Sequence, residues 1–273
     1  MGWHAPQALS SWLCGGLVLL AWLGPVAAQE PPAAPPGTEG DAAMQAAAKA
    51  RKPEGALAWF KQGAELAQQG DYPAALARFE KARALSPNWA LPHVEIAVAH
   101  LMTDNDRAAI GAALKRAVEL GPDIPRARYL YGVFLHEAGD RPAAVHELVQ
   151  ALKLRPSLLD ARYRLATLYV EEGRQAEGIQ QFELVLTQRP SHLGSMRNLA
   201  VLYERSGQLE EAEKHLLGIT RLHGKNANHL TALARFYQRA GWQAKAQAAL
   251  REAERLDPSK DARKLRPLLK SRS

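Results

Sequence analysis

Prolines recur along this chain of 273 residues at a nearly fixed interval. Counting from Pro87, the successive steps fall on Pro122, Pro156, Pro190, Gly224 and Pro258. The first step is 35 residues long and each of the others is 34. A sustained period of this size is typical of stacked supersecondary units, because one such unit cannot bury its apolar face alone.

The composition of these units favours helices. Leu, Ala, Glu, Gln, Lys and Arg dominate, only 7% of the residues are aromatic, and runs of β-branched residues are scarce. A turn glycine divides most units, at Gly70, Gly139, Gly173, Gly207 and Gly241. The closing proline then ends a second helix. We therefore expect an all-α fold of six helix-turn-helix units.

Two columns of the aligned units differ in side-chain size. The eighth position is always small, at Gly63, Ala97, Gly132, Ala166, Ala200 and Ala234. The twenty-fourth position is always bulky, at Phe79, Leu114, Leu148, Phe182, Leu216 and Leu250. Small residues allow two helices to approach closely, and bulky residues fill the space between layers. These columns predict a tight helix crossing in every unit.

The pattern resembles the tetratricopeptide repeat, a helical hairpin of 34 residues. The first unit carries the resemblance through Trp59, Gly63, Ala75, Phe79, Ala82 and Pro87, and later units add Leu165 with Tyr169 and Leu199 with Tyr203. The resemblance implies a right-handed superhelical solenoid of six repeats, at residues 56–89, 90–124, 125–158, 159–192, 193–226 and 227–260. The second repeat has one extra residue, which we place in the turn "MTDNDRAA", and the fifth ends in Gly224.

The N-terminus is typical of a secretory signal. Residues 9–28, "LSSWLCGGLVLLAWLGPVAA", contain no charged residue and end in small side chains, which predicts cleavage after Ala28. An uncleaved membrane anchor is the alternative, because no Lys or Arg precedes the apolar run and its length approaches that of a short span. Cys14 lacks the small preceding residue that a lipoprotein signal requires. We expect an exported protein, in the periplasm or associated with the outer membrane.

Two further segments flank the repeats. Residues 29–55 are rich in Pro and Ala and lack large apolar side chains, which predicts an extended linker. Residues 261–273 hold five basic residues and one acidic residue, so +4 of the net charge of +7 lies in this C-terminal cap or tail. The remaining chain is only mildly basic and has no stripe of cations mixed with aromatic residues, so nucleic-acid binding is not favoured. The tail or an uncleaved N-terminus would be the route of any membrane contact.

No catalytic or cofactor motif is found in the sequence. Phosphate-binding glycine loops, nucleophile elbows and dinucleotide fingerprints are all absent. His93 and His100 lie seven residues apart on one expected helix, but they occupy columns that hold packing residues in the first repeat. We therefore expect no enzyme activity, no cofactor and no metal.

The resemblance implies a groove lined by the first helices, to which positions two, five, nine, twelve and thirteen of each repeat contribute. The candidate groove residues are Phe60, Val94, Val98, Tyr129, Val133, Tyr163, Arg197, Arg205, Arg235 and Arg239. This set is apolar in its N-terminal half and basic in its C-terminal half. It predicts a protein partner that offers an extended or helical segment with apolar and then acidic residues.

Two functions remain open from the sequence. The first is a non-catalytic scaffold or adaptor in the bacterial cell envelope, which supports the assembly of a pilus, secretion or motility complex. The second is a periplasmic module that binds an anionic glycan or polymer during cell-surface synthesis, through the arginines and the basic tail.

Overall fold

The structure is a computed structural model that describes residues 54–222 and 226–257. These residues form twelve α-helices and no strand, which confirms the all-α helical-repeat fold. The predicted signal segment, nearly all of the linker and the basic tail lie outside the described residues. Glu54 and Gly55 differ from the prediction, because they form the start of the first helix rather than the end of the linker.

The chain divides into two compact units, which meet at Ala127 and Arg128. The first unit holds α3 (Glu54–Gln68), α4 (Tyr72–Leu85), α5 (Ala90–Met102) and α6 (Arg107–Leu120). Helix α7 (Pro125–Glu137) contains the boundary between the units. The second unit continues with α8 (Arg141–Leu154), α9 (Leu159–Glu171), α10 (Gln175–Gln188), α11 (Leu193–Arg205), α12 (Leu209–Leu222), α13 (Ala227–Arg239) and α14 (Gln243–Leu256).

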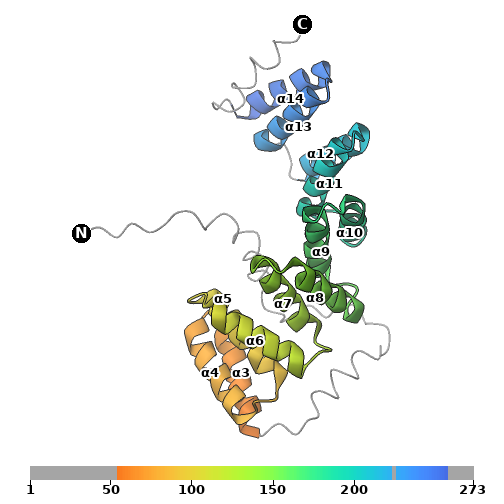
Figure 1. The fold of residues 1–273 in the computed structure, drawn as a ribbon. Helices are drawn as coiled ribbons and strands as arrows, with labels where there is room; N and C mark the ends of the chain where they lie inside the picture. The colour runs from red at the N-terminus through yellow and green to blue at the C-terminus, as the bar shows by residue number, and fades with distance from the viewer. Residues whose placement is uncertain (1–53, 223–225, 258–273) are drawn as a thin grey trace, which may run out of the picture. The chain divides into compact units, whose positions relative to one another are not determined.

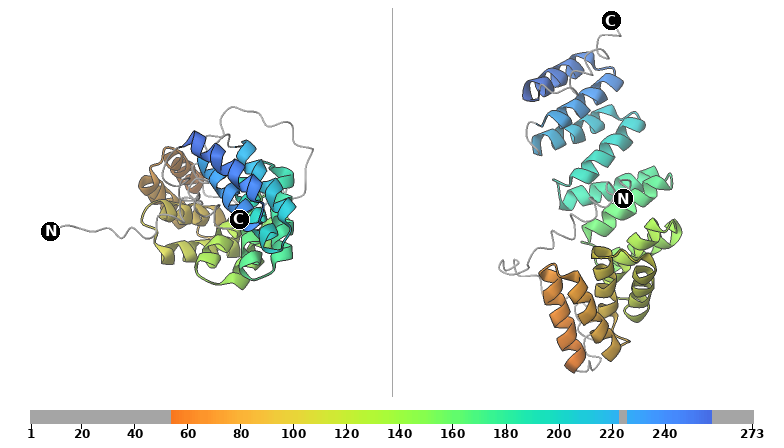
Figure 2. Two further views of the ribbon diagram at one scale, coloured as in Figure 1. Left: turned by 90° about the horizontal axis from the view of Figure 1, so that it is seen from above. Right: turned by 90° about the vertical axis from the view of Figure 1, so that its left-hand side faces the viewer.

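Consecutive helices pair as antiparallel hairpins, and within each unit one hairpin packs on the next (Figures 1 and 2). From α5 onward, each first helix begins at the first residue of a repeat expected from the sequence. The hairpins of the second unit appear in Figure 2 as successive layers from green to blue. The first helices of neighbouring hairpins therefore run in the same direction, as do the second helices.

The turn inside a hairpin depends on one residue with positive φ. Gly139 adopts φ +87° after α7, and the Asp140 side chain then accepts a hydrogen bond from the Ala143 backbone N–H to cap α8. The second repeat has no glycine here, and Asn105 takes the role with φ +52°. Asn is one of the few residues that tolerate this conformation. The longer turn between α5 and α6 accommodates the extra residue predicted in this repeat.

The two size columns meet inside the hairpins. A Cβ added to Gly63 would lie 2.7 Å from Cε1 of Phe79, and one added to Gly132 would lie 2.9 Å from Cγ of Leu148. Each pair joins the eighth position of a repeat to its twenty-fourth position. The structure therefore shows the close crossing that the alternation of small and large residues predicts.

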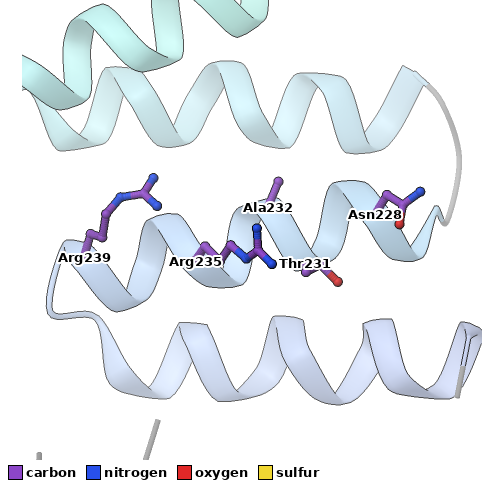
Figure 3. Close-up of a pocket in the computed structure, with 5 residues that line it drawn as sticks. All are labelled: Asn228, Thr231, Ala232, Arg235 and Arg239. Atoms are coloured by element: carbon purple, nitrogen blue, oxygen red, sulfur yellow. The ribbon is translucent and has the colours of Figure 1, made fainter. Parts of the chain in front are cut away.

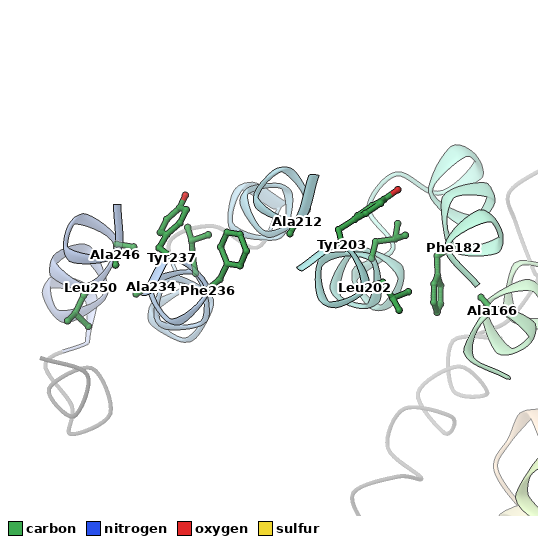
Figure 4. Packing of buried hydrophobic residues seen from close by; sticks show 13 residues of the cluster. Ala166, Phe182, Leu202, Tyr203, Ala212, Ala234, Phe236, Tyr237, Ala246 and Leu250 are labelled. Carbon is green, nitrogen blue, oxygen red and sulfur yellow. The ribbon is translucent and has the colours of Figure 1, made fainter. Parts of the chain in front are cut away.

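The main core of the second unit runs through α9 to α14 as an alternation of small and aromatic residues (Figure 4). Phe182 is 1% exposed and Leu199 is fully buried. The figure places Ala166, Ala212, Ala234 and Ala246 among Phe182, Tyr203, Phe236 and Tyr237. This interleaving keeps the interior close-packed from one hairpin to the next, so the helices that carry surface residues are held in fixed positions.

Candidate functional site

A hollow of the second unit lies between α11 and α13 and has a volume of about 520 Å³. Its apolar lining comes from three helices: Ala200 and Val201 of α11, Leu216 and Ile219 of α12, and Ala232 and Phe236 of α13. Its polar lining consists of Arg197, Glu204, Asn228, His229 and Arg239. We call this hollow the α11–α13 groove. Val201 is 43% exposed, so an apolar side chain is available there for contact with a partner.

A smaller hollow of about 330 Å³ adjoins the groove along α13 (Figure 3). It is lined by Asn228, Thr231, Ala232, Arg235 and Arg239. Asn228, Ala232 and Arg239 line both hollows, so the two form one continuous site. The spacing of these residues at three and four along the helix explains their common face.

Arg239 is held by an acidic residue one hairpin away. Its Nε and Nη2 donate to the two carboxylate oxygens of Glu204, at 2.6 and 2.9 Å. This bidentate hydrogen bond raises the pKa of the Arg239 guanidinium above its usual value. The pair places no net charge at its end of the groove.

Arg197 and Arg235 are different, because neither forms an ion pair with any residue in the described part of the chain. Both side chains are exposed, on α11 and α13 respectively. Arg205 is also exposed, but it lines neither hollow. The site therefore combines an apolar floor with two arginines whose charge is available to an anionic group.

The sequence-based prediction is wrong for Val94. This residue of α5 is 0% exposed, because α5 packs between α4 and α6, and its side chain cannot contact a partner. Phe60 is half-buried and packs against Phe79 and Trp89, with ring centroids 5.5 and 4.8 Å away. In the first unit, these two predicted groove residues therefore contribute to packing between hairpins.

Tyr163 also has a packing role. Its ring lies 5.5 Å from Phe182 and 5.0 Å from His192, and its hydroxyl accepts a hydrogen bond from Nδ2 of Asn198 at 3.2 Å. Asn198 lies one repeat later in the chain, so the tyrosine joins α9 to α11. Its half-buried side chain presents less surface to a partner than the sequence pattern suggested.

The other apolar candidates are half-buried: Val98 on α5, and Tyr129 and Val133 on α7. Burial raises the pKa of the Tyr129 hydroxyl, and the nearby Arg164 opposes that shift. That Val98, Tyr129 and Val133 contact a partner stays a prediction. Of the ten candidates, only Arg197, Arg235 and Arg239 line the joined hollows.

Four residues that the sequence pattern did not predict also line the groove: Glu204, Asn228, Leu216 and Ile219. A signal for Glu204 was present, because it lies at the twelfth position of its repeat and Arg239 lies at the thirteenth position of the next. His136 and Glu171 occupy the same two columns, with His136 Nε2 2.8 Å from Glu171 Oε2. Leu216 and Ile219 carried no such signal, because they belong to a second helix.

His93, one of the two histidines at helical spacing, packs within the first unit. His93 is buried, and its Nε2 lies 3.1 Å from the backbone oxygen of Pro87. The described residues contain no group of three His, Cys, Asp or Glu side chains suited to a metal ion. None of the described helices has the length and apolar character needed to cross a membrane.

Four family models of the tetratricopeptide repeat match the sequence. The matches cover residues 56–89, 97–157, 137–192, 169–236 and 230–260. Together they cover most of the chain and nearly all of its described residues. The chain belongs to the tetratricopeptide-repeat family.

Solved structures of this family have the same fold. PilF of Pseudomonas aeruginosa is 20% identical with a TM-score of 0.63. The match covers 78% of this chain and 97% of PilF. PilW, described as a widely conserved type IV pilus biogenesis factor, is 17% identical with a TM-score of 0.62. The match covers 78% of this chain and 99% of PilW. YrrB, described as having an unusual peptide-binding site, is 20% identical with a TM-score of 0.57. The match covers 71% of this chain and 98% of YrrB. No curated protein matches the sequence.

Proposed function

We propose that this protein is a non-catalytic adaptor whose α11–α13 groove binds a short segment of another protein. The observation that carries the proposal is the position of Arg197 and Arg235, which have no acidic partner in the described residues, beside an apolar floor. Arginine binds carboxylates through a planar set of donors, and the floor accepts aliphatic or aromatic side chains. The arrangement suits a segment in which apolar residues precede acidic ones.

The lining of the groove supports a partner segment that carries both kinds of residue. The apolar contacts come from Val201, Leu216 and Ile219, whereas the two available arginines lie at Arg197 and on the adjoining face of α13. A partner in an extended or helical conformation can place one or two apolar side chains on the floor while a neighbouring carboxylate reaches an arginine. Specificity would then depend on both elements, because neither hollow is deeply enclosed.

We further propose that the adaptor works in the cell envelope and supports assembly of a surface machinery such as a pilus, secretion or motility complex. The signal-like N-terminus supports export. The similarity in fold to PilF and PilW is consistent with a role in assembly. A groove that binds protein segments and lacks a catalytic constellation suits such a role.

A direct test is fluorescence anisotropy with the full chain and two labelled peptides. One peptide carries two leucines followed by two glutamates, and the other has glutamines in place of the glutamates. We expect tighter binding of the acidic peptide. The double variant Arg197→Gln with Arg235→Gln is expected to weaken that binding about tenfold and to abolish the preference.

The matched control is Arg205→Gln with Arg251→Gln. These arginines are exposed, and they lie outside both hollows, so this variant removes the same net charge. Circular dichroism would check that both variants remain helical. If the control weakens binding as much as the groove variant, or if neither does, the proposed site is wrong.

An anionic glycan is the second candidate partner, because the same two arginines and the basic C-terminal tail could hold a polyanion. The discriminating measurement is retention on immobilised polygalacturonate compared with the acidic peptide at 0.05 and 0.5 M salt. Glycan contacts made by exposed charges alone should disappear at high salt, whereas apolar peptide contacts should persist. Retention on the glycan without peptide binding would favour the second function.

A further inference from the structure

One edge of the second unit is basic, and its cations do not line the groove. The second helices of neighbouring hairpins run in the same direction, so their C-terminal ends lie on the same edge of the stack. The ends of α8, α10 and α12 carry four cations: Lys153, Arg155, Arg189 and Arg221. We call this set the basic edge. Cations are favoured at these positions because the helix dipole is negative at its C-terminus.

The four cations have few acidic neighbours in the sequence. Asp160 is the one acidic residue among residues 151–161, 185–195 and 219–222, which make up this edge through α12. Within the described chain none of the four cations forms an ion pair. Their charge is therefore available to an external anionic partner.

The opposite edge, at the turns inside the hairpins, has the reverse character. Its acidic residues are Glu137, Asp140, Glu171, Glu172, Glu177, Glu204, Glu210 and Glu211. Many of the cations there are paired, for example Arg174 with Glu172 and Glu177. From α8 to α12 the two edges of the second unit thus differ in charge, whereas the end of α14 also carries acidic residues and its Arg255 is paired with Glu252.

Exposed leucines accompany the cations of the basic edge. Leu154 lies between Lys153 and Arg155 in the sequence and is 42% exposed. Leu222 follows Arg221 and is 50% exposed. Long cationic side chains beside apolar ones are typical of surfaces that lie at the boundary between lipid headgroups and acyl chains.

We propose that the basic edge binds an anionic lipid surface. The charge of the edge complements anionic headgroups, and the two leucines can enter the headgroup region while the cations stay at the phosphates. A membrane is favoured over an acidic protein, because the cations form a row along helix ends rather than lining a hollow. This contact is peripheral, involves no membrane-spanning helix, and does not depend on the peptide-binding function of the groove.

The cations of the basic edge and the available arginines of the groove lie on different helices. Arg189 and Arg221 lie at the ends of second helices, whereas Arg197 and Arg235 lie on the first helices α11 and α13. A protein bound to lipid through the basic edge can therefore keep the groove available. The arrangement would hold an adaptor at a membrane surface while it captures its partner.

The test is co-sedimentation of the full chain with vesicles of pure phosphatidylcholine and with vesicles containing 30% phosphatidylglycerol. The neutral vesicles measure any binding by the apolar residues 9–28, so the additional binding to anionic vesicles reports on charge. Each cation near an anionic surface changes the partition coefficient about fivefold. We therefore expect a loss of about 100-fold in the charge-dependent part for the triple variant Lys153→Gln, Arg155→Gln and Arg189→Gln.

The matched control removes three cations from the opposite edge: Arg141→Gln, Arg174→Gln and Arg205→Gln. This control has the same net charge as the basic-edge variant and keeps the same basic tail. Its lipid binding should differ from that of the wild type by less than about threefold. Thermal unfolding followed by circular dichroism would check that each variant folds. Equal losses in the two triple variants, or wild-type binding by the basic-edge variant, would overturn the proposal.

A second variant tests the leucines without changing charge. Leu154→Ser with Leu222→Ser should weaken binding to anionic vesicles about tenfold, and the loss should persist at 0.5 M salt. Unchanged binding would show that the leucines take no part. Peptide anisotropy on the basic-edge variant should be unchanged, so failure of the lipid proposal and failure of the groove proposal are distinguishable.

Discussion

The carboxylate of Glu204 on α11 accepts two hydrogen bonds from the guanidinium of Arg239 on α13, at 2.6 and 2.9 Å. The two residues lie 35 positions apart, so the contact connects successive hairpins. It also determines the charge of the α11–α13 groove, because it neutralises one of the three arginines that line the joined hollows. The groove is therefore less basic than the sequence suggests, and its available charge is concentrated on Arg197 and Arg235.

Replacing Glu204 should strengthen the binding of acidic segments. The variant Glu204→Gln releases the charge of Arg239, and an exposed charge of this kind contributes roughly 0.2–1 kcal/mol. Anisotropy with the acidic peptide should show an increase in affinity of up to about fivefold at low salt, and the gain should vanish at high salt. Weaker binding instead would mean that Glu204 itself contacts the partner.

Two helical glycines should respond in opposite ways to alanine. A Cβ on Gly178 would lie 2.5 Å from Cγ2 of Val170 and 3.1 Å from the backbone oxygen of Ala166, so Gly178→Ala should lower the free energy of unfolding by about 1–3 kcal/mol. A Cβ on Gly218 would meet only the flexible end of Met196, at 3.2 Å. Gly218→Ala should be neutral or stabilise by up to about 1 kcal/mol. Urea unfolding of both variants would measure the contrast, and equal effects would contradict it.

The hydroxyl of Tyr203 should contribute to stability. It donates a hydrogen bond to Oε1 of Glu183 at 2.5 Å, and burial together with this carboxylate raises the pKa of the tyrosine well above its usual value. Tyr203→Phe should lower the free energy of unfolding by about 1–2 kcal/mol, because the acceptor is charged and the contact is partly buried.

Tyr169 provides the control for this measurement, because it occupies the same column one repeat earlier. In the part of the chain that the structure describes, its hydroxyl makes no hydrogen bond, and its ring lies 4.1 Å from the Arg174 guanidinium. Tyr169→Phe should therefore change the free energy of unfolding by less than about 0.5 kcal/mol. A similar loss in both variants would show that the Glu183 contact is not the cause.

Stability should decrease as the pH falls below neutrality, and His192 should contribute to that decrease. Its Nδ1 accepts a hydrogen bond from the Ser195 backbone N–H at 3.1 Å and so caps α11, which a protonated Nδ1 could not do. Burial, with the neighbouring Arg189, lowers the pKa of His192 below its ordinary value near 6.5. The unfolded chain binds the proton more readily, so this stabilisation is complete above pH 6.5 and is lost as the pH falls through the lower folded pKa.

The variant His192→Asn separates this effect from other titrations. Asn is also a good N-cap but does not titrate in this range, so α11 keeps its cap while one source of pH dependence is removed. Chemical unfolding between pH 7.5 and 5.0 should show a shallower loss of stability than in the wild type. His93 and His215, whose pKa values are also lowered by burial, should supply the remaining dependence. An identical pH profile would contradict the role of His192.

The sequence by itself determined the repeat architecture of this protein. The proline period, the turn glycines and the alternation of small and large columns act over a few residues or within one hairpin. Each of these signals restricts local backbone geometry, and the same signal recurs in every repeat. The helices and the Gly63–Phe79 crossing therefore follow from patterns that can be read along the chain. Even the exceptional turn at Asn105 was located by its extra residue.

Only the tertiary structure decided which side chains are available for binding. Val94 and Tyr163 occupy the same column as Arg197, yet Val94 is fully buried, Tyr163 packs against Phe182 and His192, and Arg197 is exposed. Whether a side chain of this column is buried or exposed depends on the rotation between neighbouring hairpins. That rotation is set by contacts among residues about 20 to 35 positions apart. The Glu204–Arg239 pair is another such contact. A pattern read within one repeat cannot predict such a contact, because the interaction energy that fixes the contact arises only when two hairpins pack together.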